Sequence, residues 1–353
     1  MKAQSLLFCL LATVISCSHG PVKEAQIDYY VDDLGLKNLI QPLADNIRQL
    51  EGSPQQKLKL GTIEIDKKDY LAKLRLLNLF METNSDKILV NQLIAKLFKV
   101  VEVQSDRDNK EILLTSYYSP MIKGSKTKSE KYSFAILKKP ENVNYSRSEI
   151  SAKNPYQNQK LEICYLDPIE AFFLHVQGSG MVEFENGETF NLVFDGNNGR
   201  PYQSLGKSLA EQGILEKDKV TLASLETYLR SLTPAELEKT LNLNESYIFF
   251  KISEKKSLTT LGNEANPGRT IATDGALFSK GLLGYMEFGK PIFDETGKVE
   301  FIPTSRFVLD QDTGSAIKGS GRVDLFWGEG EGAKAHAGVV KEKAKLYYLV
   351  PRS

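Results

Sequence analysis

The sequence predicts a mainly β protein with some α-helix, in which the strands form barrels. Two observations support this fold class. From about Glu111 onward the chain contains short β-rich runs punctuated by Gly, Pro, Asn and Asp, and helical spacing of apolar residues is concentrated within residues 67–100 and 204–243. Short strands at such spacing are typical of barrels rather than of a parallel α/β sheet.

Two core-facing helices are expected before the β-rich part, within residues 67–80 and 89–100, where apolar residues recur at helical spacing. Another helix should begin at Thr233, which can cap it, with Pro234 in the first turn and Glu236 completing a capping box. The expected strands are ILLTSYY, YSFAIL, FFLHVQ, MVEF, FNLVF, YIFFK, KVEFI, RFVLDQD, RVDLFW and KLYYLV.

Length and composition limit the classes of function. The 353 residues suffice for two domains, since a typical domain has about 100–200 residues. Lys plus Arg number 45, as do Asp plus Glu, so no net charge favours nucleic acid, and we expect no such partner. Three Cys and three scattered His argue against a disulfide framework, a metal site or a histidine-based triad. We expect neither metal nor cofactor.

An apolar run near the N-terminus resembles a secretory signal. Lys2 precedes the run LLFCLLATVIS, which is too short to span a bilayer as a mature helix. The four residues from Val14 to Cys17 resemble a bacterial lipoprotein processing box, and cleavage there would leave a lipidated Cys17. A plain signal peptide cut after Ser18 or Gly20 is the alternative, but only lipidation explains a cysteine at this position.

The residues after the cysteine predict where the protein is retained. Ser18 rather than Asp follows Cys17, which resembles lipoproteins sorted to the outer membrane of Gram-negative bacteria. We therefore expect a lipid anchor on the periplasmic face of the outer membrane. The polar residues 17–55, which end near Gly52, Ser53 and Pro54, are expected to form the anchor, a tether and a poorly anchored first helix.

Asp324 is the most informative residue, because aspartate is depleted in strands and this one lies in the middle of a strand-like run. Residues alternate here, so Arg322, Asp324 and Phe326 should share one face, opposite a buried apolar face. Glycine-rich turns on both sides would let a ligand approach the backbone closely. This pattern alone fits both a catalytic carboxylate and a strand with a hydrated polar face.

Asp324 lies in the last of six segments that together cover roughly residues 60–350. They are LLTSYYSPMIKGSKTKSEKYSFAILKKP (113–140), FFLHVQGSGMVEFENG (172–187), YQSLGKSLAEQGIL (202–215), NESYIFFK (244–251), IATD (271–274) and DTGSAIKGSGRVDLFWG (312–328). In content and order they resemble the membrane-bound lytic transglycosylase A family, the peptidoglycan-cleaving enzymes of glycoside hydrolase family 102. Six segments in order are a far stronger signal than one short motif.

The resemblance implies a double-psi β-barrel domain, a second β-barrel domain inserted into it, and a substrate groove between them. On this chain residues 1–16 would be the signal peptide and 17–55 the lipid anchor and tether. Residues 56–120 and 252–353 would form the discontinuous catalytic domain, and 121–251 the insertion. The expected partners are peptidoglycan glycan strands and, through the anchor, the outer membrane. We expect a monomer.

The resemblance also implies a reaction with one acid/base. The enzyme would cleave the β-1,4 bond between N-acetylmuramic acid and N-acetylglucosamine, and the C6 hydroxyl of the former would close a 1,6-anhydro ring. By position in the motif, Asp324 is the general acid and base. Asp312, the second candidate catalytic residue, is expected to support it, and Asp274 to be structural. Burial of Asp324 would raise its pKa and a nearby cation would lower it, so the sequence leaves the sign open.

Substrate-binding residues are expected in two segments and one loop. One segment offers an amide, a hydroxyl and two glycines to N-acetyl sugars, from Gln177, Gly178, Ser179 and Gly180. The other offers hydroxyls and aromatic rings, from Thr115, Ser116, Tyr117 and Tyr118, with Lys318 from the loop. Alternation aims the two tyrosines at opposite faces, so a core role for one of them is equally expected.

Two other functions stay open. The chain could be a non-catalytic peptidoglycan-binding double-psi barrel lipoprotein, although the intact Asp324 and the VQGSG segment favour an enzyme. It could also be an ordinary hydrolase that uses Asp312 and Asp324 as a pair. Ser116 and Ser315 stand where the family commonly has glycine, which affects the expected local backbone rather than the activity.

Overall fold

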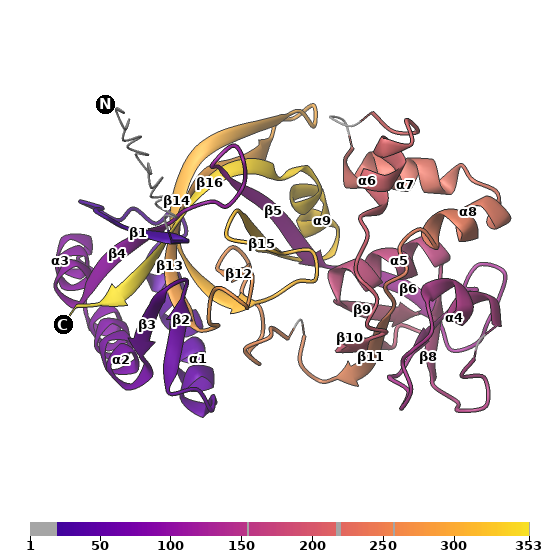
Figure 1. Ribbon diagram of the computed structural model, residues 1–353, viewed down its shortest axis with the longest axis horizontal. Coiled ribbons are helices and arrows are strands. Elements are labelled where there is room, and N and C mark those ends of the chain that lie inside the picture. Colours follow the sequence, from indigo (N-terminus) through magenta and orange to yellow (C-terminus); the bar gives the residue numbers. More distant parts are fainter. Residues whose placement is uncertain (1–19, 154, 217–219, 257, 353) are drawn as a thin grey trace, which may run out of the picture.

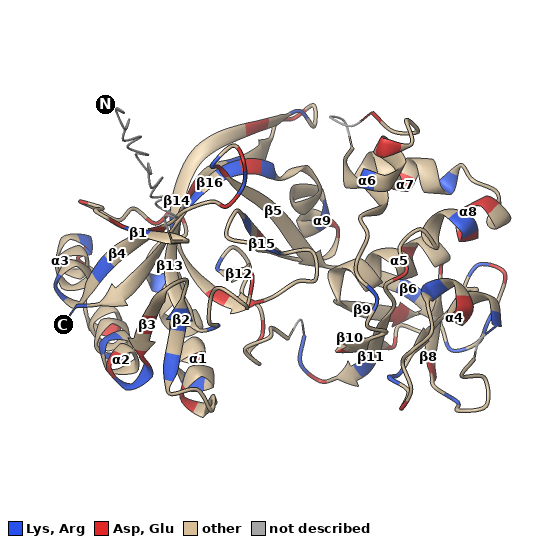
Figure 2. Ribbon diagram, viewed as in Figure 1, with Lys and Arg blue, Asp and Glu red and all other residues tan. Residues whose placement is uncertain are grey.

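The computed structural model describes residues 20–153, 155–216, 220–256 and 258–352. Figure 1 shows two lobes side by side, each with a β-sheet and helices around it. Acidic and basic residues are interspersed over both lobes (Figure 2), in keeping with the balanced composition. The predicted lipidation site Cys17 lies outside the described residues. Within the described ranges, no helix combines the length and the apolar character needed to cross a membrane.

The first lobe is built around a closed six-stranded barrel. Its strands follow in the order β16 (Lys341–Pro351), β13 (Leu282–Phe293), β14 (Val299–Asp312), β12 (Thr270–Ala272), β15 (Arg322–Glu329) and β5 (Ile112–Ser119), and β5 pairs back onto β16. Two pairs, β12 with β14 and β15 with β5, are parallel, and the other pairs are antiparallel. The predicted mainly β fold with a barrel is confirmed.

Both halves of the chain contribute to this lobe. β1 (Val22–Ala25) and β4 (Phe98–Val103) extend the sheet beyond β16, and the lobe also contains α1 (Lys37–Gly52), β2 (Lys57–Leu60), β3 (Ile63–Asp66), α2 (Lys67–Thr83) and α3 (Lys87–Leu97). One apolar core joins the early helices to the late strands, since Leu43, Leu74, Leu283 and Val308 are all fully buried in it.

The second lobe is built on another six-stranded sheet. Its strands follow in the order β11 (Ile248–Ser253), β10 (Thr189–Asn197), β9 (Ser179–Phe184), β6 (Met121–Ser125), β8 (Glu162–Leu166) and β7 (Phe134–Leu137). Its helices are α4 (Arg147–Lys153), α5 (Pro168–Gln177), α6 (Leu205–Glu211), α7 (Leu222–Arg230) and α8 (Pro234–Leu241). Its apolar clusters draw on residues 122–250. The predicted domain limits at 121 and 251 stay a prediction.

Two secondary-structure predictions were wrong. The run FFLHVQ lies in α5 rather than in a strand: Asp167 caps this helix, Pro168 begins it, and Gly178 ends it at a left-handed φ of 79°. A short apolar run cannot by itself distinguish a buried helix from a buried strand. Residues 98–100, predicted as helix, belong to β4. As a result Gln177 ends a helix instead of lying in a strand.

The N-terminal part is also more ordered than predicted. β1 pairs with β4, and α1 buries one face, with Leu43 and Leu50 fully inaccessible to solvent. The first helix predicted within residues 17–55 is present as α1. The loose tether and the poor anchoring of that helix are wrong from Val22 to Gly52. Polar composition suggested a tether, but apolar residues of α1 pack into the core, and Asp32 and Asp33 pair with charged groups of the barrel.

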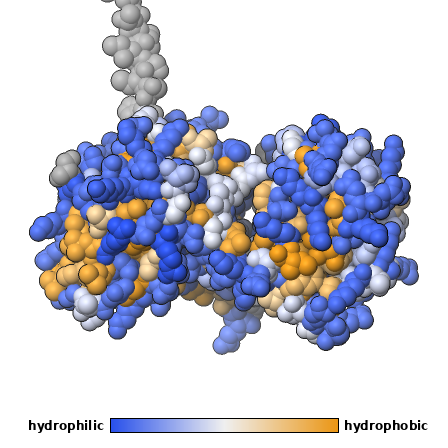
Figure 3. All heavy atoms as spheres, turned by 90° about the horizontal axis from the view of Figure 1, so that it is seen from below, coloured by the Kyte–Doolittle hydropathy of each residue, from blue (hydrophilic) through white to orange (hydrophobic). Residues whose placement is uncertain are grey.

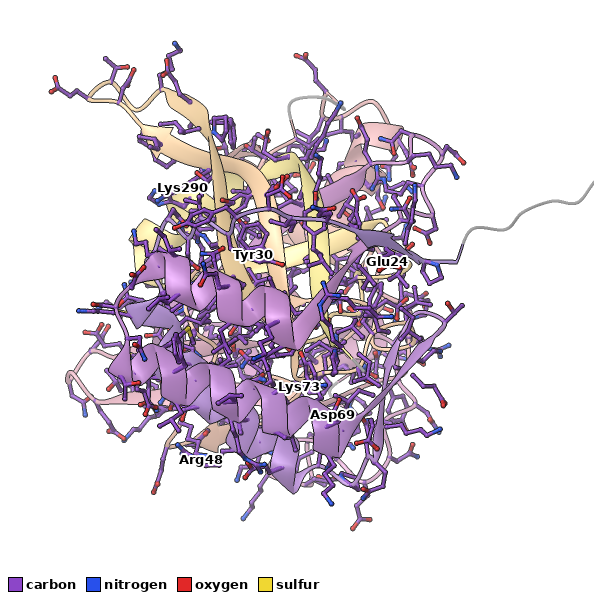
Figure 4. All side chains as sticks on the ribbon, turned by 90° about the vertical axis from the view of Figure 1, so that its left-hand side faces the viewer. Glu24, Tyr30, Arg48, Asp69, Lys73 and Lys290 are labelled. Atoms are coloured by element: carbon purple, nitrogen blue, oxygen red, sulfur yellow. The ribbon has the colours of Figure 1, made fainter. Side chains whose placement is uncertain are left out.

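The segment between β1 and α1 is attached to the barrel by charged groups. Asp32 accepts hydrogen bonds from Arg269, and the two side chains are 1% and 2% exposed. Asp33 accepts hydrogen bonds from Arg306 and also pairs with Lys290, 3.1 Å away on β13. Figure 4, which views the molecule from the left-hand side of Figure 1, shows Tyr30 of this segment and Lys290. These three ion pairs attach the segment before α1 to the barrel.

We expect Asp32→Ala to lower the free energy of unfolding by about 3–5 kcal/mol, because it leaves the Arg269 charge buried and unpaired. Urea unfolding followed by circular dichroism measures this effect. The matched control is Asp45→Ala, which breaks the more exposed pair with Arg48 and should change stability little. Equal effects of the two substitutions would contradict a structural role for the buried pair.

Candidate active site

Asp324 is positioned by strand β15, which pairs with two other strands. The parallel register with β5 sets it opposite Thr115, and the antiparallel register with β12 sets it opposite Ala272. Val323 and Leu325 are fully buried and attach the strand to the core, whereas the Asp324 side chain stays 15% exposed. The predicted alternation therefore leaves this carboxylate at the surface of the barrel.

One oxygen of this carboxylate is held and the other is available. Thr115 Oγ1 donates a hydrogen bond to Asp324 Oδ1, and Arg322 Nε lies 3.5 Å from the same oxygen. Oδ2 accepts no hydrogen bond from the described residues, and it is not sealed from solvent. A bound substrate can therefore reach Oδ2.

The structure also decides the sign of the pKa shift at Asp324. Burial raises the pKa of this carboxyl, the Arg322 charge and the hydrogen bond from Thr115 lower it, and the Asp312 charge raises it again; the net effect is a raised pKa. A raised pKa increases the protonated fraction near neutral pH, as a general acid requires.

Asp312, at the end of β14, is held by four donors. Tyr117 Oη donates to Oδ2 at 3.0 Å, while Oδ1 accepts from Thr260 N, Thr260 Oγ1 and Thr313 N at 2.9–3.1 Å. Donors on both oxygens fix this carboxylate and leave little capacity for a substrate proton. The Asp312 charge also raises the pKa of Asp324. The supporting role of Asp312 stays a prediction.

The two tyrosines of β5 face opposite sides, as alternation predicts. The Tyr117 ring packs against Phe326, with ring centroids 5.1 Å apart, and remains partly exposed beside the carboxylates. Tyr118 is 3% exposed and packs with Ala333 and Ala337 of α9 (Gly330–Val339). Tyr118 is therefore a core residue, and its predicted stacking against sugar is wrong.

Thr115 and Ser116, which precede the two tyrosines on β5, also project from opposite faces of the strand. Thr115 faces Asp324 and also accepts a hydrogen bond from Arg322 Nη2 at 3.3 Å. Ser116 lies opposite Leu325, and its hydroxyl is buried with no hydrogen-bond partner in the part of the chain that the structure describes. Sugar contact by Ser116 is thus contradicted, because the pleat turns its side chain away from the carboxylates.

Gln177 joins the second lobe to β5. Its Oε1 accepts a hydrogen bond from Tyr118 N at 3.2 Å, while its amide nitrogen has no hydrogen-bond partner among the described residues. Gly178 has open space where a Cβ would be, whereas a Cβ at Gly180 would overlap Leu174. Gln177 and Gly178 therefore remain accessible to a ligand. Packing accounts for the glycine at 180, and Ser179 begins β9 partly exposed.

The loop 313–321 is held by carboxylates rather than left open for a ligand. Asp274 accepts hydrogen bonds from Ala276 N and Gly319 N, and Asp106 accepts one from Gly321 N. A Cβ at Gly319 would overlap the Asp106 carboxylate, and φ there is 78°. Close approach by protein atoms, not by ligand, explains this glycine, which corrects the expectation for the turn before β15.

Lys318 is exposed on the same loop. Its positive charge lowers the pKa of Asp274 and is not among the main influences on the pKa of Asp324. Burial would raise the pKa of Asp274, but two amide hydrogen bonds and the charges of Lys318 and Lys280 outweigh it, so the pKa is lowered. Asp274 is thus a structural anion, as predicted. The role of Lys318 in substrate binding stays a prediction.

Sequence reasoning missed three residues of the site. Tyr202, from the second lobe, interacts electrostatically with both Arg322 and Asp324, and burial raises its pKa. It begins one of the six family segments, which was the available signal. Asp106 and Thr260 lie in no motif, and no sequence signal indicated them.

The lobes also meet beside the site. Leu222 of α7 packs onto the cluster of Tyr118 and α9, and Lys334 of α9 lies 3.2 Å from Glu226 of α7. Figure 3 shows the two lobes with a narrower region between them. A separate cavity of about 1650 Å³ opens elsewhere on the barrel, lined by residues such as Glu102 and Phe288; Asp324 does not line it.

Two family models match the chain. The MltA specific insert domain matches residues 142–251, and the 3D domain matches residues 269–350. The chain belongs to the membrane-bound lytic murein transglycosylase A family. Asp312 and Asp324 both lie in the 3D domain of this family, and Gln177 lies in the insert domain.

Individual family members agree with this assignment. The membrane-bound lytic murein transglycosylase A of Escherichia coli is 28% identical over 245 residues, which cover 67% of this chain and 65% of that protein. A membrane-bound lytic murein transglycosylase from Agrobacterium tumefaciens has the same fold, with a TM-score of 0.80 and 22% identity over 94% of this chain and 98% of the other. The E. coli protein with bound chitohexaose gives a TM-score of 0.73 and 21% identity over 94% and 93%.

The two groups of the Gln177 amide can be separated by substitution. Gln177→Glu keeps an oxygen for the Tyr118 amide but loses the free NH₂ donor, whereas Gln177→Ala loses both. If the NH₂ group binds sugar, Gln177→Glu should keep the parent's thermal stability. It should also lower kcat/KM on peptidoglycan, by an amount that corresponds to a loss of about 1–3 kcal/mol in transition-state binding. Parental kinetics for Gln177→Glu would assign this residue to structure alone.

Proposed function

We propose that this protein is a peptidoglycan lytic transglycosylase with Asp324 as its single general acid and base. The observation that carries the proposal is a carboxyl with a raised pKa whose Oδ1 is held by Thr115 while Oδ2 is free. The family assignment supplies the substrate class. We further propose that residues 121–251 form the inserted domain and that the glycan lies between the lobes, beside Tyr117 and Gln177.

The proposed reaction needs no water and returns the enzyme to its starting state. Asp324 gives its proton to the glycosidic oxygen as the bond from C1 of N-acetylmuramic acid to O4 of N-acetylglucosamine breaks. The C6 hydroxyl oxygen of the same N-acetylmuramic acid then bonds to C1 and loses its proton to the Asp324 carboxylate. The products are a 1,6-anhydromuramyl end and a chain that begins with N-acetylglucosamine.

A relative supports glycan binding. The E. coli family member has been solved with chitohexaose, a chain of N-acetylglucosamine units, and its fold matches 94% of this chain. Sugars of this class present N-acetyl and hydroxyl groups. The accessible Gln177 amide can pair with such groups, and the Tyr117 ring beside Asp324 offers an apolar surface to a sugar face.

The site disfavours the two alternative functions. A hydrolase would need a second available carboxylate, yet Asp312 is already bound by Tyr117, Thr260 and Thr313. A purely glycan-binding protein would have no use for a carboxyl that is partly buried, raised in pKa and open on one oxygen. A lyase accounts for both observations.

Asp324→Asn is expected to abolish cleavage while leaving the fold intact. Asparagine is nearly isosteric and can still accept the Thr115 hydrogen bond, but it cannot transfer a proton. General acid–base assistance contributes about 10² to 10⁴ in rate, and one residue would supply both steps here, so the loss should reach the upper end. Mass spectrometry of digested sacculi measures the release of 1,6-anhydromuropeptides.

Asp312→Asn is the matched comparison and should cost less, because Asp312 would act only through Asp324. The catalytic role would move to Asp312 if Asp324→Asn kept near-parental release while Asp312→Asn was inactive. Products with ordinary reducing ends would favour the hydrolase, and binding without any product would favour the non-catalytic function.

We also propose that the mature protein begins at a lipidated Cys17 and is held on the periplasmic face of the outer membrane. The support is the sequence itself: Lys2, the apolar run and the residues from Val14 to Cys17. The described structure begins only three residues later, so a lipidated cysteine would hold the barrel lobe near the membrane surface.

Cys17→Ala is expected to leave the precursor unprocessed or the protein without lipid, and so to change its location. Metabolic labelling with a fatty acid, followed by separation of inner and outer membranes, tests this expectation. Replacing the buried Cys164 by alanine is the matched control, since that thiol lies inside the second lobe and should not affect labelling. If the Cys17 variant fractionates like the parent, the anchor is elsewhere.

A further inference from the structure

Arg322 contacts three groups around the carboxylate of Asp324. The two residues are separated by one position on β15, so their side chains project from the same face of the strand. Nη1 donates to the carbonyl oxygen of Ala316 at 3.1 Å, and Nη2 donates to Thr115 Oγ1 at 3.3 Å. Nε is buried, makes no hydrogen bond with the described residues, and lies 3.5 Å from Asp324 Oδ1 as an ion-pair contact.

These contacts give the Thr115 hydroxyl a defined direction. Its oxygen accepts from Arg322, so its single hydrogen is free to be donated to Asp324 Oδ1. A carboxylic acid accepts hydrogen bonds best at its carbonyl oxygen. The proton of a protonated Asp324 is therefore favoured on Oδ2, the oxygen that is not held by protein groups.

We infer that Arg322 is a positioning residue, which together with Thr115 holds Oδ1 of Asp324 as a fixed acceptor and directs the transferable proton to Oδ2. This inference rests on the proposed function. The guanidinium also binds the loop 313–321 through Ala316, and Asp274 and Asp106 hold the other end of that loop. The carboxylate and the loop are thus fixed relative to each other by one side chain.

The charged and titratable groups around Asp324 make the inference testable by pH. They are Arg322 on β15, Asp312 on β14, and the phenols of Tyr117 on β5 and Tyr202 from the second lobe. Arg322 is the cation in this set, and its charge lowers the pKa of Asp324 against the effect of burial. Without Arg322 the pKa of Asp324 should rise further.

The sign of the kinetic effect follows from the order of steps. Cleavage begins with protonated Asp324, so kcat/KM should fall as pH rises through the pKa of this group in the free enzyme. Removing the cation should move this alkaline limb to higher pH. A side chain that only held the strand in place would lower the rate without moving the limb.

The experiment compares Arg322→Gln, Arg322→Lys and Thr115→Val with the parent, by the pH dependence of kcat/KM for 1,6-anhydro product release from soluble glycan strands. We expect Arg322→Gln to move the alkaline limb upward and to lower kcat/KM at the optimum by about 10- to 100-fold, by analogy with the loss of hydrogen-bond partners that orient metal ligands. Arg322→Lys should keep the limb near the parental pH, because it keeps the charge.

Thr115→Val keeps the side-chain volume and should also move the limb upward, because the hydroxyl lowers the pKa of Asp324. This variant keeps the test decisive if Arg322→Gln does not fold. The matched control is Arg75→Gln, which removes an arginine from a surface ion pair on α2 and should reproduce the parental profile.

The inference would be overturned if the alkaline limb of the kcat/KM profile stayed at the parental pH in folded Arg322→Gln. The same result in Thr115→Val would overturn it when Arg322→Gln does not fold. Failure of the proposed function would look different, because the parent itself would then release no 1,6-anhydro product. An upward shift in Arg322→Gln without one in Arg322→Lys supports the assigned role. Upward shifts of the same size in both would overturn it, since the charge would then not matter.

Discussion

The pairing of β5 is the constraint on which the rest of the structure depends. This strand closes the barrel, since it pairs in parallel with β15 and antiparallel with β16, and the chain then continues through Pro120 into the second lobe. Its register sets Thr115 opposite Asp324. A shift by one residue would bring Ser116 to that position and reverse the faces of Tyr117 and its neighbour. The strand pairing that closes the barrel therefore also sets the position of Thr115 relative to the Asp324 carboxylate.

The aspartates around this strand differ in role because the fold gives their carboxylates different hydrogen-bond donors. Asp310 is fully buried and bound by Lys280, Thr273 and Tyr348 at 2.5–2.6 Å, which makes it part of the core. The carboxylates of Asp274, Asp106 and Asp312 each accept backbone amides and hold loops. Asp324 differs in that it accepts no backbone amide from the described residues: the Thr115 hydroxyl holds one of its oxygens, and the other accepts no hydrogen bond from them. A free oxygen on a rigid strand is what proton transfer needs.

The candidate active site lies mainly on the barrel, and the second lobe contributes further side chains to it. Gln177 reaches β5 from the end of α5, and this helix is itself fixed from inside the lobe. Arg147, 1% exposed, lies 3.0 Å from His175 of α5 and donates to the carbonyl oxygens of Asn244 and Ser246. Burial lowers the pKa of His175 far below its ordinary value, so this contact is made by a neutral imidazole. A rigid α5 keeps the Gln177 amide near the barrel.

The sequence alone determined the fold class, the alternation around Asp324 and on β5, and, through six ordered segments, the family; it also indicated Asp324 as the candidate acid. Each of these depends on residues near one another in the chain or on short motifs. It misassigned FFLHVQ and the N-terminal tether, and it left open the sign of the pKa shift at Asp324. Only tertiary structure decided these points, because the deciding groups are remote: Thr115 and Asp324 are 209 residues apart, and Asp32 and Arg269 are 237 apart. Packing brings such pairs together, and no local pattern encodes them.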